Sequence, residues 1–160
     1  AMLPFRSLVR PKKRLRHKRS GSEEASISSK YPTLEDKLAA LRTETDALDR
    51  HFLYEAIVRE TFRLRHDDHK MRQLCERIGM EHLREFPRIA ARLRREIGYG
   101  HMPPVFTFQA MGALMTEWGA YQKAVDIYEM ALRYGIDDDT EGGFRRKITA
   151  LHRLMRHGAK

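Results

Sequence analysis

Residues 105–136 read VFTFQAMGALMTEWGAYQKAVDIYEMALRYGI, and this stretch decides the fold. Its apolar residues recur at helical spacing, which predicts two amphipathic helices over residues 105–118 and 121–134. Gly119 interrupts the pattern where the permissive backbone of a glycine ends a helix before a tight turn. The stretch therefore predicts a helical hairpin.

Small and large residues follow one another in this hairpin in an order that resembles the tetratricopeptide repeat, a helix pair of about 34 residues. The matching positions are Phe108, Met111, Gly112, Met115, Ala124, Tyr128, Ala131 and Ile136. Gly112 and Ala124 are small where the two helices of such a repeat cross, and Ile136 replaces the terminal proline. The resemblance implies that residues 105–138 form one repeat of a short solenoid of antiparallel helix pairs, similar to bacterial tetratricopeptide-like proteins of unassigned function.

A second, degenerate copy of the pattern fits residues 51–87. When Pro87 is aligned with the final proline of the repeat, Cys75 takes the small crossing position. Gly79 and His82 then replace an aromatic residue and an alanine, which weakens the match. Residues 88–102 are interpreted as an insertion between the two copies.

A capping helix over residues 143–157 is expected to close the array. Ile148, Leu151 and Leu154 share one stripe and are expected to pack inward. Arginines on the other side supply the polar outer face that a terminal repeat needs.

The helices upstream are placed by their start and stop signals. Thr33 followed by Asp36 resembles a helix start, and this first helix is expected to reach about residue 49. A second helix covers residues 51–65, and a third, capped by Asp67 or Asp68, ends near residue 85. Pro87 marks a boundary before a short helix over residues 88–97. No stretch alternates at period two, so the predicted fold class is all-α.

The positive charge of the chain is concentrated at its start. Eight of the 31 Lys and Arg residues lie within residues 1–20, where there is no acid, and the net charge is +9. Residues 1–32 are interpreted as a basic, flexible arm ahead of a helical domain over residues 33–160. Phosphate contacts from the arm would give salt-sensitive, sequence-independent binding of nucleic acid. The cations concerned are Lys12, Lys13, Arg14, Arg16, Lys18 and Arg19. Contact with anionic lipid and a solvated tail without a role are the alternatives.

By resemblance, the concave face of the first helix of the repeat binds a protein or peptide. The positions on that face are Phe106, Gln109, Ala113, Thr116 and Glu117. They lack the lysines and asparagines that grip a terminal carboxylate in chaperone-binding relatives, so a carboxylate clamp is disfavoured. The equally weighted alternative is that this face packs on the upstream helices.

A catalytic or metal site has little support in the sequence. His66 and His69 flank two aspartates, but an Asp pair is typical of a turn, and we weigh the structural interpretation at roughly nine to one. Cys75 lies on an apolar stripe, where a buried thiol is the ordinary outcome. We expect no enzyme activity, no cofactor and no bound metal.

These observations rank three hypotheses. First comes a protein-binding adaptor, second a nucleic-acid-associated protein that uses the arm, and third a metal-assisted enzyme. The single cysteine fits a reducing compartment, and no apolar run nears the ~20 residues of a membrane span, so a cytoplasmic location is expected. Two repeats are fewer than usually stand alone, so a homo-oligomer formed through the N-terminal face is an alternative to a monomer.

Overall fold

The computed structural model describes residue 23 and residues 25–158. Residues 25–30 are helical. The later elements are α2 (Leu34–Thr43), α3 (Ala47–Arg63), α4 (His69–Arg92), the π-helical turn η1 (Leu93–Ile97), α5 (Phe106–Glu117), α6 (Tyr121–Arg133) and α7 (Gly143–Gly158). No strand occurs in these described ranges, so the predicted all-α class is confirmed.

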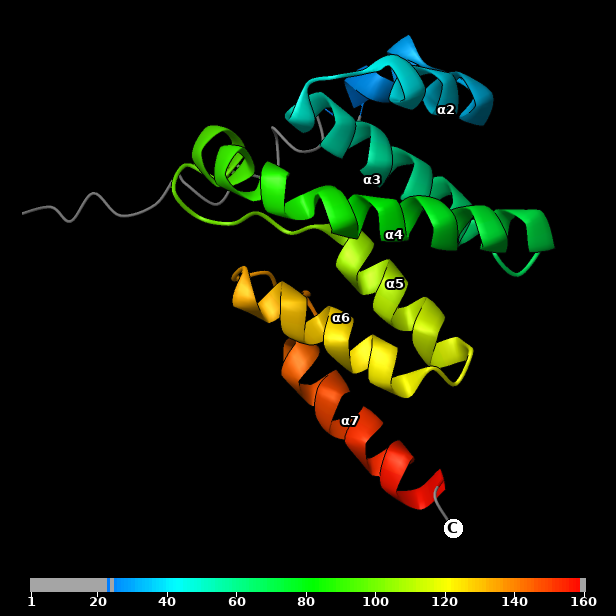
Figure 1. The fold of residues 1–160 in the computed structure, drawn as a ribbon, viewed down its shortest axis with the longest axis vertical. Coiled ribbons are helices and arrows are strands. Elements are labelled where there is room, and N and C mark those ends of the chain that lie inside the picture. The colour runs from blue at the N-terminus through cyan, green and yellow to red at the C-terminus, as the bar shows by residue number, and fades with distance from the viewer. Residues whose placement is uncertain (1–22, 24, 159–160) are drawn as a thin grey trace, which may run out of the picture.

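The helices from α2 to α7 stack in chain order along the long axis of the molecule (Figure 1). α3 runs antiparallel to α4, and α5 runs antiparallel to α6, while α7 packs on α6. α5 also packs against both α3 and α4, which joins the two helix pairs into one core. Successive hairpins are thus present, and their assignment to the tetratricopeptide type stays a prediction.

Three predicted helix ends are confirmed, and each depends on neighbouring residues alone. The Asp36 amide donates to Thr33 Oγ1 over 3.0 Å at the start of α2, and the Lys70 amide donates to Asp68 Oδ1 over 2.8 Å at the start of α4. Each bond satisfies a donor that the helix itself leaves unpaired. After α5, Gly119 has a φ of +75°, a left-handed conformation that glycine adopts without strain.

The prediction that the first helix reaches residue 49 is wrong. α2 ends at Thr43, and Asp46 starts α3 by accepting the Asp49 amide over 3.0 Å. Arg50 then donates through Nη1 to the carbonyl oxygens of Leu41 and Glu44, at 2.6 and 2.9 Å. These bonds satisfy carbonyl groups at the end of α2 and so stabilise the interruption between α2 and α3. The spacing of apolar residues alone does not reveal this interruption.

The boundary predicted at Pro87 is also wrong, because α4 runs through it to Arg92. A proline inside a helix removes one hydrogen bond and costs about 3 kcal/mol. Pro87 is exposed, while Phe86, Ile89 and Leu93 are at most 1% exposed on the inner face. Burial of each large apolar side chain contributes roughly 1.5–3 kcal/mol. The burial of these three side chains therefore exceeds the cost of the proline. The predicted short helix over residues 88–97 is therefore the end of α4 and η1.

Helical structure begins earlier than the sequence indicated. Residues 25–30 form a helical turn inside the segment assigned to the arm, and the Tyr31 amide donates to the Ile27 carbonyl over 2.8 Å. Ile27 and Tyr31 pack against the core because both carry apolar surface that the helices can cover. The predicted phosphate-binding cations between Lys12 and Arg19 lie outside the described residues.

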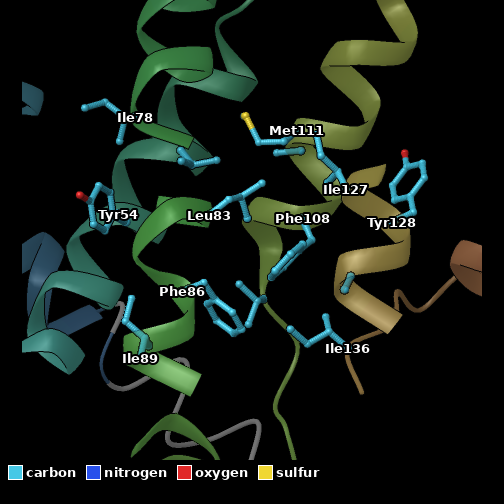
Figure 2. Packing of buried hydrophobic residues seen from close by; sticks show 14 of the residues in the cluster. Tyr54, Ile78, Leu83, Phe86, Ile89, Phe108, Met111, Ile127, Tyr128 and Ile136 are labelled. Atoms are coloured by element: carbon cyan, nitrogen blue, oxygen red, sulfur yellow. The ribbon is translucent and has the colours of Figure 1, made fainter. Parts of the chain in front are cut away.

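The eight residues that carry the resemblance all lie inside the protein. The seven with side chains are at most 3% exposed, and Gly112 is buried with them. Figure 2 shows Phe108 and Met111 of α5 pointing toward Leu83 and Phe86 of α4. A Cβ added to Gly112 would overlap Cε1 of Tyr128, so the Tyr128 ring of α6 fills the space beside this glycine.

Gly112→Ala is expected to destabilise the protein by about 1–3 kcal/mol, the usual cost of overpacking a core. The added methyl group would meet the Tyr128 ring, which is stacked on the Phe144 ring with centres 4.8 Å apart. Urea denaturation measures the loss. In a Tyr128→Leu background the same substitution should cost clearly less, and an equal cost in both backgrounds would contradict the close approach.

Candidate functional site

A groove of about 350 Å³ lies between α5, α6 and α7. Its walls are mostly apolar, and Leu154 is 45% exposed at its edge. The residues that line it are Ala113, Thr116, Glu117, Tyr128, Lys147, Ala150, Leu151 and Leu154. Exposed apolar hollows of this kind often mark the sites where a protein binds another molecule, because binding removes apolar surface from water.

Helical spacing explains why these side chains meet. Residues 113, 116 and 117 share one side of α5, and residues 147, 150, 151 and 154 share one side of α7, since positions three and four apart lie on one face. Ala113 and Ala150 are small, which leaves space between the two helices. The Tyr128 ring from α6 lies below them.

The two charged groups that line the groove already have partners within this chain. Arg65 donates to the Glu117 carboxylate through Nη2 at 2.7 Å and Nε at 3.1 Å. This hydrogen bonding from Arg65 lowers the pKa of Glu117 below its usual value. Lys147 pairs with the carboxylate of Asp138. The groove is therefore close to neutral along its walls.

Its outer border on α7 is cationic. Arg146, Arg153 and His157 are exposed, and their spacing of seven and four residues places them on one stripe beside the residues that line the groove. Arg145 and Arg156 occupy the opposite side of the same helix. α7 carries five Lys and Arg residues and no acid between Gly143 and Gly158.

The predicted binding face is divided by the structure. Ala113, Thr116 and Glu117 line the groove, whereas the Phe106 ring meets the Phe62 ring of α3 at 5.7 Å. Phe106 lies at a second hollow of about 390 Å³ toward α2 and α3. Gln109 lies between these regions and is half-buried. One end of the face thus packs on upstream helices and the other remains open.

The contribution of α7 to the groove was not predicted from the sequence. Leu151 is buried as expected and Ile148 is half-buried, but Leu154 is largely exposed, so the prediction that it packs inward is wrong for this residue. The sequence feature that could have indicated this contribution is a second stripe, shifted by one residue, through Lys147, Ala150 and Leu154. Whether this stripe lines a groove depends on the position of α5, which the spacing of apolar residues does not reveal.

A chain of buried hydrogen bonds joins α3, α4 and α5. His51 Nε2 lies 2.8 Å from Glu55 Oε1, and His51 Nδ1 lies 2.8 Å from His82 Nε2. His82 Nδ1 is in turn 2.7 Å from Thr107 Oγ1. We refer to these four residues as the histidine relay. The His82 side chain lies fully inside the core.

Only one arrangement of protons satisfies every bond of the relay when both rings are neutral. The Glu55 carboxylate accepts from His51 Nε2, so His51 Nδ1 must accept from His82 Nε2. His82 Nδ1 then accepts from the Thr107 hydroxyl. Burial, and to a smaller extent the neighbouring His51, lowers the pKa of His82 well below its usual value. With His51, His82 and Thr107 at most 1% exposed, the relay is closed to substrates.

The residues once considered for a metal site contact different partners. His66 Nε2 lies 3.8 Å from Glu117, His69 is hydrogen-bonded to Gln73, and Asp68 is committed to capping α4. In the part of the chain with described positions, no three potential ligands gather around one point. Burial raises the pKa of the Cys75 thiol, which makes it a poor nucleophile.

Among the helices of the described ranges, none combines the length and the apolar character that crossing a membrane requires. No family model matches the chain, and neither a curated protein nor a solved structure matches it.

Proposed function

We propose that the chain is a helical protein-interaction module whose groove between α5, α6 and α7 binds a peptide segment of a partner protein. The observation that supports this proposal is an open apolar hollow whose two charged wall residues, Glu117 and Lys147, are already paired internally. An occupant can therefore cover the apolar walls without leaving either charge unpaired.

The size of the groove favours a peptide anchor over a cofactor. Sites for small molecules span about 300–1,000 Å³ and enclose most of the ligand. At about 350 Å³ this groove is at the small end of that range, and it is open along α7. It suits one or two apolar side chains of a longer segment whose backbone stays at the surface. Binding of a helix or strand to such a groove is a common mode of peptide recognition.

The proposal predicts that filling the groove blocks binding. Ala150 is exposed on the wall, so Ala150→Trp should occupy the hollow with little cost to folding. Peptides selected from a displayed random library against the full-length chain should lose at least about tenfold in affinity for this variant, or 1.4 kcal/mol. Fluorescence anisotropy with labelled peptides measures the change.

Thr149→Trp is the matched control, because residue 149 is exposed on the opposite side of α7 and receives the same side chain. It should leave affinity within about twofold, an effect below 0.5 kcal/mol. Peptides that bind both tryptophan variants as tightly as the native chain would show that the groove is not the binding site.

The charge distribution favours a second candidate function, association with nucleic acid. Residues 1–20 hold eight Lys and Arg residues without an acid, and α7 adds five more. Replacing Lys12, Lys13, Arg14, Arg16, Lys18 and Arg19 by serine in the full-length chain tests it. Binding of a mixed-sequence oligonucleotide should fall steeply with salt and vanish in the serine variant, and unchanged binding would exclude the arm.

A further inference from the structure

We infer that the segment bound in this groove is acidic, with aspartates or glutamates beside its apolar anchor residues. The inference rests on the proposed function and specifies the chemistry of the partner. It follows from the arginines that lie beside the groove, on α7 and near the end of α5.

The border formed by α7 supplies two arginines. Arg146 and Arg153 lie on the stripe next to Ala150 and Leu154, so their side chains reach solvent along the open side of the groove. The nearest carboxylate to Arg146 is that of Glu141, at 4.0 Å, and its side chain is 95% exposed. Such an exposed ion pair contributes little to stability. Arg146 can therefore leave Glu141 and bind a ligand carboxylate at little cost in free energy.

The opposite border, at the end of α5, is also cationic. Glu117 is bound by Arg65, and the charge of Arg72 acts on the same carboxylate. The Arg72 guanidinium lies 4.7 Å from the centre of the partly exposed Trp118 ring. Its Nε is buried without a hydrogen-bond partner among the described residues. Arg65 and Arg72 thus both act on the Glu117 carboxylate and offset its negative charge.

The apolar walls and the cationic borders have separate effects on binding. Burial of apolar side chains provides most of the affinity, at about 25 cal/mol for each Å² removed from water. Exposed charges at the edge act mainly on the association rate and on the choice between partners. A cationic or neutral segment would lose this attraction, and a cationic one would be repelled by both borders.

The groove is less suited to nucleic acid, although phosphates would meet the same cations. Binding of single strands depends on aromatic faces that are open to bases. The one aromatic ring among the lining residues, Tyr128, is stacked on Phe144 with ring centres 4.8 Å apart, and Lys147 lies 5.8 Å from its centre. The other walls are mainly aliphatic, and these favour Leu-like anchors.

The test selects displayed random 16-residue peptides against the full-length chain at 0.15 M salt, and then measures the best binders against charge variants. We expect the selected peptides to be enriched in Asp and Glu near apolar residues. The pair Arg146→Glu and Arg153→Glu should weaken them about tenfold or more. The pair Arg145→Glu and Arg156→Glu changes the same net charge on the other side of α7 and should weaken them less than about threefold.

Each other outcome overturns the inference in a recognisable way. Neutral or basic peptides that are still blocked by Ala150→Trp would refute the acidic partner and leave the proposed function standing. Peptides insensitive to Ala150→Trp would refute both. Equal losses from the two arginine pairs, together with displacement of the peptides by a mixed-sequence oligonucleotide, would show general attraction of anions to α7.

Discussion

Phe86→Ala is expected to lower the free energy of unfolding by about 3–5 kcal/mol, the range for removing a buried phenylalanine. Phe86 is 0% exposed on α4. Its ring meets the Phe108 ring edge-on at 5.1 Å, and both residues are seen in Figure 2. It also meets the Tyr134 ring edge-on at 5.0 Å. These partners belong to α5 and to the end of α6, so the substitution removes contacts that join the two helix pairs.

Phe52→Ala is the control, because it deletes the same atoms from a half-buried site at the edge of the core. It should cost markedly less, about 1–2 kcal/mol, since part of the ring is already in water. Urea denaturation followed by circular dichroism compares the two variants. Equal losses would mean that Phe86 does not occupy the centre of the structure.

Acidification from pH 6.5 to pH 5 is expected to lower the free energy of unfolding through His82. The pKa of His82 is lowered well below its usual value in the folded chain by burial, with His51 contributing. The unfolded chain therefore binds a proton near pH 6.5 that the folded chain does not bind. Stability therefore falls as the pH is lowered below that value, with a slope of at most about 1.4 kcal/mol for each pH unit from this one proton.

The pH window separates this effect from that of the carboxylates. The pKa values of Glu85 and Glu117 are lowered by their hydrogen bonds with arginines, so the stability that they contribute is lost only as the pH falls below about 4.5. Measurements between pH 7 and pH 5 thus report on histidines. The groups facing His82 in this range are His51, Tyr54 and Thr107.

His82→Gln should flatten the dependence of stability on pH between 7 and 5, whatever its effect on stability at pH 7. His152→Gln, at an exposed position on α7, should leave the slope unchanged. The measurement is the free energy of unfolding in urea at several pH values. If the curves of unfolding free energy against pH were parallel for His82→Gln and the native chain, the buried neutral His82 would not be the cause of the pH dependence.

The parts of the fold that were predicted correctly depend on residues close in sequence. Thr33, Asp68 and Gly119 act within three residues of themselves, so local chemistry was sufficient. Pro87 was misread because its local preference was outweighed by Phe86 and other inner residues, whose burial depends on helices far along the chain.

The candidate site could be predicted only in part, because half of it depends on how separate helices pack together. Ala113, Thr116 and Glu117 were found because the resemblance assigns a face to α5. Ala150 and Leu154 were missed because only the position of α7 on α6 brings them to the groove. The histidine relay could not be predicted from the sequence either. His51 and His82 are 31 residues apart and come into contact only when α3 packs against α4.

The like charges on α7 also bear on how copies of this chain could meet. A row of stacked helices has two ends, and α7 lies at one of them in the described part of the chain (Figure 1). The outer side of α7 presents Arg145, His152 and Arg156. Two such ends repel each other, and desolvating the arginines would add a further cost. Two copies of the chain are therefore not expected to associate with each other through this side of α7.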